Sequence, residues 1–231
     1  MTITFITGAN KGLGRETARR LVELGHTVLV GARDPEQGAA AAEALGARFV
    51  RIDVTDDASV AAAAADVAAH EGRIDVLVNN AGVAGPGADP AGLTAADALA
   101  VFDVNLFGVI RTTTAFLPLL RGSADPVVVN VSSGLGSVAV THDPDRVEST
   151  VVAPLYTSSK AALVMLTTQY AKAFKDIRVN AVDPGYTATD LNAHSGPQTV
   201  TEGTDAIVRL ATEPAGAGTG RFIDRHGQVP W

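Results

Sequence analysis

The feature that most constrains the fold is a glycine cluster near the start of the chain. The segment TGANKGLG at residues 7–14 lies between a β-branched run at residues 2–6 and an amphipathic run at residues 13–24. Glycines allow a tight turn and let a phosphate approach the backbone, and a following helix offers free N–H groups and a positive dipole end. This strand–loop–helix context predicts a phosphate-binding loop. The loop residues expected to line it are Gly8, Asn10, Lys11, Gly12, Leu13 and Gly14.

Strand-like and helix-like segments alternate along the rest of the chain. Apolar or β-branched runs predict strands at residues 2–6, 27–30, 48–52, 74–78, 127–131, 178–182 and 221–223. Amphipathic or alanine-rich runs predict helices at residues 13–24, 36–45, 56–70, 94–119, 155–174 and 201–211. This alternation indicates βαβ units and a parallel sheet, and continuously apolar strands are typical of a sheet covered on both faces. We therefore expect an α/β fold, a single-domain doubly wound (Rossmann) parallel sheet of about seven strands spanning residues 1–231, with helices on both faces.

Composition disfavours several classes of function. The 231 residues carry a formal net charge of -7, which does not suit a nucleic-acid partner. There are no cysteines and the five histidines form no pair at ligand spacing, so we expect no disulfide scaffold and no metal site. No apolar run reaches the ~18 residues that cross a bilayer, and the loop that starts at Gly8 leaves no room for a signal peptide. We therefore expect an intracellular, cytoplasmic protein with no membrane partner.

A tyrosine and a lysine four residues apart carry a chemical signal. Tyr156 and Lys160 open the helix predicted at residues 155–174, and positions i and i+4 share one helix face. A carbonyl that accepts a hydride becomes an alkoxide and needs a proton donor, but a tyrosine with a pKa near 10 is a weak one at neutral pH. An ammonium at ~4 Å and an effective dielectric of ~20 stabilises tyrosinate by about 4 kcal/mol, or roughly three pKa units. We therefore predict that Lys160 lowers the pKa of Tyr156, which acts as a general acid.

The glycine loop and the Tyr–Lys pair together resemble the classical short-chain dehydrogenase/reductase family. The resemblance rests on the spacing Gly-x-x-x-Gly-x-Gly and on Tyr156-x-x-x-Lys160, and it spans nearly the whole chain. It implies that the hydroxyl of Ser133 hydrogen-bonds the substrate oxygen. Ser132 is the weaker candidate because side chains alternate along a strand. Asn105 resembles the family's helix asparagine, which suits an ordered water in proton relay from Lys160, while a role only in distorting the helix stays open.

The same resemblance implies a nicotinamide cofactor, and the second predicted strand indicates which one. An acidic residue at the end of that strand binds ribose hydroxyls and favours NAD, but this chain has Ala32 there, followed by Arg33. The guanidinium of Arg33, with Lys11 as a second cation, suits the 2′-phosphate of NADP(H). The alternative stays open that Arg33 is a solvated residue partly neutralised by Asp34, in which case NAD(H) would serve. Further cofactor contacts are implied for Asp53, Val54, Asn80, Ala81, Gly82, Tyr156, Lys160, Pro184, Gly185, Thr187 and Thr189.

For Asn80 we expect a mixed role, bracing the sheet edge as well as facing the cofactor.

Two irregular segments are expected on the substrate side. Residues 134–154 form an insertion or substrate loop that resembles, in shorter form, the insertion of carbonyl-reductase-like members. Residues 186–200 form a substrate lid. Members with such an insertion are often monomers, so a monomer is favoured here, and a homodimer or homotetramer stays open.

The sequence therefore predicts an NADP(H)-dependent oxidoreductase of the carbonyl-reductase-like branch. It would transfer a hydride between the nicotinamide and a ketone, an aldehyde or a secondary alcohol, with Tyr156 as acid/base. Two alternatives stay open: a catalytically silent NADP(H)-binding regulator, and an NAD-dependent alcohol dehydrogenase of the same family. A serine hydrolase is disfavoured because G-x-S-x-G is absent. These motifs do not specify the substrate.

Overall fold

A seven-stranded, wholly parallel sheet forms the centre of the computed structural model, which describes residues 1–86 and 89–231. The strand order is β3-β2-β1-β4-β5-β6-β7. The predicted fold class is therefore confirmed. The strands are β1 (Ile3–Thr7), β2 (Thr27–Ala32), β3 (Arg48–Arg51), β4 (Val76–Asn79), β5 (Val127–Val131), β6 (Arg178–Val182) and β7 (Phe222–Ile223).

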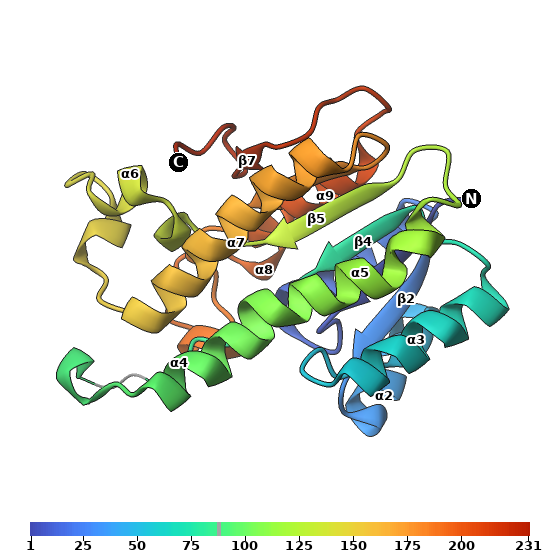
Figure 1. Cartoon of the computed structure of the whole chain (residues 1–231), viewed down its shortest axis with the longest axis horizontal. Helices are drawn as coiled ribbons and strands as arrows, with labels where there is room; N and C mark the ends of the chain where they lie inside the picture. The colour runs from blue at the N-terminus through green and yellow to red at the C-terminus, as the bar shows by residue number, and fades with distance from the viewer. Residues whose placement is uncertain (87–88) are drawn as a thin grey trace.

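Helices cover both faces of the sheet because successive side chains of the apolar strands point to opposite sides. The longer helices are α1 (Gly12–Glu23), α2 (Pro35–Leu45), α3 (Asp57–His70), α4 (Ala95–Phe102), α5 (Gly108–Leu120), α7 (Pro154–Ala173) and α9 (Asp205–Thr212). On β1, Phe5 packs among residues of α3, α5 and α7, whereas Ile6 packs among residues of α1, α2 and α9. Figure 1 shows α3, α5 and α7 crossing the near face of the sheet.

The carboxyl ends of the strands meet at one edge of the sheet, where the chain order reverses between β1 and β4. In open α/β sheets, ligands bind in the crevice at such a reversal. In Figure 1 the arrowheads of β4 and β5 point toward this edge, and the N-terminus lies near the opposite one. The short helix α6 (Val138–Thr141) lies on the carboxyl-edge side, which places the segment 134–154 beside the crevice.

Two predicted helices differ from the structure in detail. The helix predicted at residues 94–119 runs from α4 to α5 through a π-helical turn, η2 (Asp103–Phe107). The helix predicted at residues 201–211 is two helices, α8 (Val200–Gly203) and α9, which meet at Thr204. Among the described residues, the stretch Ala95–Leu120 is long and apolar enough to cross a bilayer by length and composition alone, a test that buried core helices also pass.

Buried polar side chains tie the sheet to the helices beneath the crevice. Asn79 and Asn130 lie opposite each other on β4 and β5, and Asn79 Nδ2 donates to Asn130 Oδ1 over 2.9 Å. Thr112 of α5 donates to Asn79 Oδ1 over 2.7 Å, and Asn130 Nδ2 donates to Thr167 Oγ1 of α7 over 2.9 Å. The side-chain amides of Asn79 and Asn130 thereby have partners although they are buried, and the register of β4 and β5 is fixed. These contacts hold α5 and α7 against the sheet, and α7 carries the predicted site residues Tyr156 and Lys160.

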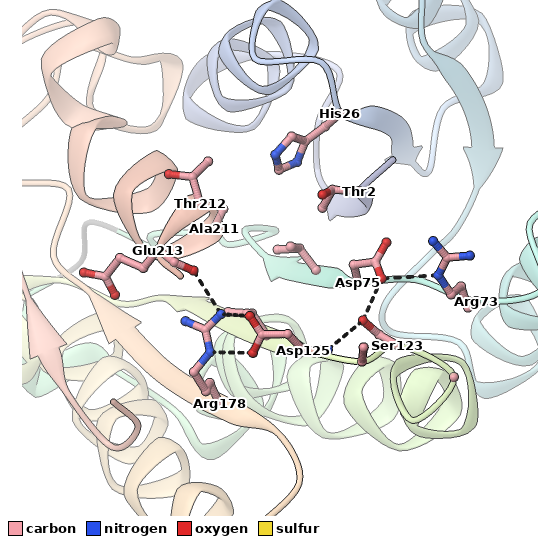
Figure 2. Close-up of a pocket in the computed structure, with 14 residues that line it drawn as sticks. Thr2, His26, Arg73, Asp75, Ser123, Asp125, Arg178, Ala211, Thr212 and Glu213 are labelled. Carbon is pink, nitrogen blue, oxygen red and sulfur yellow. Dashed lines mark hydrogen bonds and ion pairs between the residues drawn. The ribbon is translucent and has the colours of Figure 1, made fainter. Parts of the chain in front are cut away.

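A polar cleft of about 520 Å³ lies at the amino edge, far from the glycine loop. Figure 2 shows His26 above Asp75, Arg73 and Ser123 in this cleft. His26 Nδ1 lies 2.9 Å from the hydroxyl of fully buried Thr4. Burial lowers the pKa of His26 from its ordinary 6.5, and the negative charge of Asp75 opposes this only in part.

The free energy of unfolding should therefore depend on pH through His26. A histidine whose pKa is lower in the folded state stabilises the fold above its unfolded pKa, and this contribution is lost as the pH falls through the folded value. We expect urea midpoints to fall as the pH drops below about 6.5, the ordinary value. In His26→Gln this fall should be smaller, and in the exposed His226→Gln it should match the parent. An identical pH dependence in parent and His26→Gln would contradict this assignment.

Candidate active site

The glycine loop lies at the carboxyl end of β1 and leads directly into α1. Gly8 and Gly12 have φ angles of 64° and 54°, a region that favours glycine. A Cβ atom on Gly14 would lie 2.4 Å from Asn80 Nδ2 and 2.5 Å from the carbonyl oxygen of Gly8, so a side chain does not fit there. The loop is therefore held close to the segment that follows β4.

Among the described residues, no side chain caps the first turn of α1. Lys11 precedes the helix and makes no side-chain hydrogen bond to it, and the first turn holds no acidic residue. In contrast, α2 and α3 are capped by the preceding residues Asp34 and Asp56, whose carboxylates accept hydrogen bonds from backbone amides of the first turn. The amides and positive dipole end of α1 are therefore open to a phosphate.

Asn80 braces the glycine loop from the end of β4. Its Nδ2 donates to the carbonyl oxygens of Thr7 and Gly8 over 2.9 and 3.1 Å. The Thr7 hydroxyl in turn accepts from the backbone amides of Asn80 and Ala81 over 3.0 and 3.1 Å. The bracing part of the mixed role expected for Asn80 is thus present in the structure.

Arg33 lies exposed on the surface at the end of β2, directly after the buried Ala32. Asp34, considered above as a neutralising partner, instead accepts hydrogen bonds from the backbone amides of Glu36 and Gln37 at the start of α2. No ion pair within residues 1–86 and 89–231 involves Arg33, although its charge acts on Asp53. The guanidinium therefore stays available to a ligand at this end of the crevice.

Asp53 and Val54 follow β3 on the same side. Burial works to raise the pKa of Asp53, but hydrogen bonds from the amide and hydroxyl of Thr55 and the charge of Arg33 hold it below its ordinary value. Val54 is buried.

Arg51 was not among the residues predicted from the sequence for this end of the crevice. Arg51 is the last residue of β3, pairs in register with Ala32 and is exposed. A basic residue at the end of the third strand, beside the strand that ends in Ala32, is the pattern that could have identified it.

Lys11 was predicted as a second cation beside the 2′-phosphate, but in the structure its ammonium group already pairs with a carboxylate. Its Nζ lies 2.9 Å from Asp190 Oδ2, in the segment predicted as a lid. Asp190 also accepts from His194 Nε2 over 3.0 Å. The hydrogen bond and charge of Lys11, with the hydrogen bond from His194, hold the pKa of Asp190 below its ordinary value. The two side chains of the Lys11–Asp190 pair are 62% and 56% exposed, so the pair is a weak one that a stronger anion can displace.

Tyr156 and Lys160 lie in the first turns of α7 and meet near the end of β5. Lys160 Nζ lies 5.6 Å from the centroid of the Tyr156 ring and donates a 2.8 Å hydrogen bond to the carbonyl oxygen of Val131. A Cβ on Gly82 would lie 3.5 Å from the same Nζ, so the segment after β4 closes over the lysine. The structure thus brings together the pair that the i, i+4 spacing predicts.

The predicted direction of the Tyr156 pKa is wrong for this structure. Burial raises the pKa of Tyr156 to about 12; a hydrogen bond with Ser133 lowers it only in part, and the charge of Asp183 raises it further. Burial also lowers the pKa of Lys160 to about 8. Removal from water disfavours both charged forms, and the ammonium lies over the ring rather than beside the hydroxyl.

Ser133 and Ser132 point to different sides of the chain. Ser132 is buried, and its hydroxyl donates to the carbonyl oxygen of Lys160 over 3.1 Å. Ser133 is partly exposed, accepts from the amide of Leu135 over 3.2 Å and is hydrogen-bonded to Tyr156. Of the two serines, Ser133 is therefore the one that shares the site with the phenol.

Asn105 lies fully buried in the π-helical turn η2. Its Oδ1 accepts from the amide of Val83, and its Nδ2 donates to the carbonyl oxygen of Val83 and to the hydroxyl of Ser159, each over 2.9 Å. Ser159 precedes Lys160, so this amide joins η2, the segment after β4 and α7. Sequence reasoning missed Ser159, whose only signal was a hydroxyl beside the lysine.

The segment after β6 leads to the loop predicted as a lid at residues 186–200. Gly185 has a φ angle of 71°, and the buried Thr187 donates its hydroxyl to the carbonyl oxygen of Pro184 over 3.0 Å. Thr189 Cγ2 lies 3.8 Å from where a Cβ on Gly12 would be. The lid segment therefore lies against the glycine loop.

The residues that line the crevice fit a dinucleotide cofactor whose nicotinamide ring would lie near Tyr156. The uncapped N-terminus of α1 suits the phosphates, Arg33 marks one end of the crevice, and Gly82 with Lys160 marks the other. Within the described residues, no group of three His, Cys, Asp or Glu side chains suits a metal ion.

Comparison with known proteins places this chain among related sequences. A family model described as short chain dehydrogenase matches residues 2–199. The short-chain dehydrogenase anuI of Penicillium roqueforti is 37% identical over 224 residues, covering 91% of this chain and 88% of that protein. The (-)-isopiperitenone reductase of Mentha piperita is 32% identical, covering 96% of this chain and 95% of that protein.

Two solved structures share the fold over nearly the full chain. A carbonyl reductase from chicken fatty liver, solved with NADPH bound, superposes with a TM-score of 0.88 at 27% identity and covers 100% of both chains. Salutaridine reductase from Papaver somniferum superposes with a TM-score of 0.85 at 28% identity, covering 97% of this chain and 99% of that one. With the family model matching most of the chain, the protein belongs to the classical short-chain dehydrogenase/reductase family of oxidoreductases.

Proposed function

We propose that this protein is an NADP(H)-dependent oxidoreductase that interconverts a ketone or aldehyde and the corresponding alcohol. The observation that carries the proposal is the meeting of Tyr156, Lys160 and Ser133 at the carboxyl edge, in the crevice that the uncapped α1 terminus opens. A bound nicotinamide would supply or accept the hydride. The remaining chemistry is proton transfer, which side chains of this chain would perform.

Tyr156 would donate its proton to the oxygen of the substrate carbonyl. Because its pKa is raised to about 12, the Tyr156 phenol is protonated at neutral pH and carries the proton to be transferred before the substrate binds. Ser133, hydrogen-bonded to the phenol, would orient the same substrate oxygen. Lys160 would hold the cofactor ribose and stabilise the tyrosinate that remains, and its pKa of about 8 makes that charge available at neutral pH.

A proton route from Lys160 to solvent would run past Asn105. Both N–H groups of this amide are used by Val83 and Ser159, so its position is fixed from both α7 and the segment after β4. Its Oδ1 lies near Lys160 Nζ across Gly82 and keeps a lone pair that would accept from an ordered water. Its other predicted role, distortion of the helix, is compatible with the π-helical turn in which it lies.

The preference for NADP(H) rests on Ala32 and Arg33. Hydrogen bonds to charged groups contribute roughly 1.5–3 kcal/mol, which corresponds to about 10- to 150-fold in affinity. Arg33→Ala should therefore raise the Michaelis constant for NADPH by roughly that factor and leave the constant for NADH nearly unchanged. Ala32→Asp should shift the preference further toward NADH, since a carboxylate repels the 2′-phosphate and accepts from ribose hydroxyls.

Steady-state kinetics with both cofactors and a panel of ketones, aldehydes and quinones measure this preference. Arg121→Ala serves as the control, because that exposed guanidinium pairs with Asp176 at the other edge of the sheet. Added salt should weaken NADPH use more than NADH use in the parent. If the parent already uses NADH with the same efficiency as NADPH, Arg33 is only a surface residue and the NADP(H) preference fails, while the oxidoreductase assignment remains.

We also propose the carbonyl-reductase-like branch, a monomeric state and a cytoplasmic location. The segment 134–154 contains α6 and packs through Val140 on Val164 of α7 and Phe222 of β7, which supports its assignment as an insertion beside the substrate side. The lid assignment of residues 186–200 is supported by their place against the glycine loop. Size-exclusion chromatography with light scattering separates a monomer from a homodimer or homotetramer.

A further inference from the structure

A second arginine, Arg51, lies beside Ala32 at the end of the crevice where Arg33 follows β2. Strands β2 and β3 pair in parallel with Ala32 in register with Arg51, and the amide of Ile52 donates to the carbonyl oxygen of Ala32 over 3.0 Å. Because paired strands lie about 4.8 Å apart, the Arg51 side chain leaves the backbone next to that of Ala32. Arg33 is the next residue of the chain after Ala32. Two guanidinium groups therefore start from backbone positions that adjoin the same alanine.

The packing two residues earlier shows which side of the sheet Arg51 faces. Val30 and Phe49 are also in register, and both pack in the apolar cluster that α1, α2 and α9 form with the sheet. Because side chains alternate along a strand, Ala32 and Arg51 lie on this same side. The glycine loop reaches this side too, since the side-chain amide of Asn10 donates to a glutamine side chain of α2 over 3.0 Å. Arg51 therefore faces the side on which α1 and the glycine loop lie.

Ion pairing separates Arg33 and Arg51 from most arginines of the chain. Every arginine except Arg15, Arg33 and Arg51 forms an ion pair with an Asp or Glu within residues 1–86 and 89–231. All three exceptions are exposed. The other guanidinium groups are thus used inside the fold, whereas the pair beside Ala32 is left without an internal partner in the part of the chain that the structure describes.

The acidic side chains at this end of the crevice accept hydrogen bonds from neighbouring residues. Asp34 accepts from two backbone amides at the start of α2, and Asp53 accepts from the amide and hydroxyl of Thr55 over 3.0 and 2.7 Å. Lys11, the other cation predicted here, is paired with Asp190. The two guanidinium groups can therefore bind an anion without first breaking an ion pair.

A phosphate monoester suits this pair of cations. It carries a charge of about -1.5 to -2 at pH 7 and three strong acceptor oxygens, and a guanidinium presents its donors in a fork that matches them. The small, uncharged side chain of Ala32 leaves the space between the two arginines free of a competing carboxylate.

We propose that Arg51 is a second specificity-determining residue, which together with Arg33 binds the 2′-phosphate of NADP(H) beside Ala32. The inference rests on the NADP(H) preference of the proposed function and adds a residue to it. Arg51 lies on a different strand from Arg33, so the phosphate would be held from two sides. A change at Arg51 would then alter the choice between NADPH and NADH without altering binding of the parts that the two cofactors share.

Equilibrium binding of NADPH and NADH tests this assignment without turnover. Calorimetry gives the two dissociation constants, and their ratio is the readout. Arg51→Ala should weaken NADPH binding about tenfold and leave NADH binding unchanged, as expected for the loss of one hydrogen-bonded charge. Arg51→Lys keeps the charge but loses the fork, so its ratio should lie between those of the parent and Arg51→Ala. The double variant Arg33→Ala/Arg51→Ala should discriminate less than either single variant.

Arg15→Ala is the matched control. Arg15 is also exposed and without an ion pair in the described residues, but it lies on α1, so the substitution removes the same charge from another element. Any contact that it makes with the diphosphate is shared by both cofactors, and the ratio should stay at the parental value. Adenosine 2′,5′-bisphosphate and 5′-AMP repeat the comparison without the nicotinamide. Circular dichroism checks folding, and Arg51→Gln decides the question if Arg51→Ala does not fold.

A folded Arg51→Ala variant with the parental ratio would overturn the assignment and leave the preference to Arg33 alone. An equal loss of affinity for both cofactors would also overturn it, because a general effect of charge or fold does not distinguish them. A parent that binds NADH as tightly as NADPH is a separate failure, in which the NADP(H) preference of the proposed function falls and this inference falls with it. The parental ratio thus tests the proposed function, and its change on substitution tests Arg51.

Discussion

Tyr156→Phe should lower the rate of carbonyl reduction at least a hundredfold. The substitution keeps the ring that lies under Lys160 but removes the transferable proton, and general acid catalysis contributes roughly 10²- to 10⁴-fold. Affinity for NADPH should change little, since the aromatic ring of Tyr156 and the other expected cofactor contacts, Lys160 among them, are kept. Turnover numbers with a reactive ketone and NADPH binding by fluorescence titration measure the two quantities separately.

Tyr170→Phe is the matched control for this experiment. Tyr170 lies on the same helix, its pKa is also raised by burial, and its ring packs against Phe174 away from the site. The control should keep parental turnover. Near-normal turnover in a folded Tyr156→Phe variant would remove the proposed acid from the mechanism.

Lys160→Ala should lower turnover by about a hundredfold and weaken NADPH binding, because one ammonium serves both the phenol and the ribose. The parent should also lose activity above pH 8, since burial lowers the pKa of Lys160 to about 8 and the ammonium loses its proton there. That step should be missing from the pH profile of the variant. Initial rates across a pH series, with NADPH affinity measured at each end, provide both results.

Lys160→Met controls for the space that an alanine leaves, although neither variant can donate to the carbonyl oxygen of Val131. It fills most of the volume without a charge, so it should be as inactive as Lys160→Ala but more stable toward urea. Unchanged cofactor affinity together with a retained step near pH 8 in both variants would contradict the two roles assigned to the lysine.

Local patterns predicted the sheet and the pairing of Tyr156 with Lys160. Periodicity and the glycine loop depend on neighbours in the sequence, and positions i and i+4 meet in any helix. The break between α8 and α9 at Thr204 was missed, because Gly203, which ends α8, is a single glycine inside a helical pattern and such a glycine is a weak stop signal. The π-helical turn around Asn105 was not read either, since it depends on contacts with Val83 and Ser159.

Contacts between distant segments could not be predicted in this way. Lys11 pairs with Asp190, which follows it by 179 residues, and Asp183 meets the insertion only in the folded chain. The raised pKa of Tyr156 has the same origin, because desolvation depends on how closely the whole fold surrounds the phenol. The i, i+4 spacing supplies the charge pair but carries no information on burial.

The most direct test of the proposed function is a coupled measurement of NADPH and product with the purified protein. NADPH is titrated first without substrate and then with ketones, aldehydes and quinones, while NADPH absorbance and alcohol formation are followed together. We expect saturable NADPH binding, and then NADPH oxidation matched by an equal amount of alcohol with at least one carbonyl. This oxidation should be lost in Tyr156→Phe. Tight NADPH binding with no oxidation across the panel would contradict it and would identify a catalytically silent NADP(H)-binding regulator.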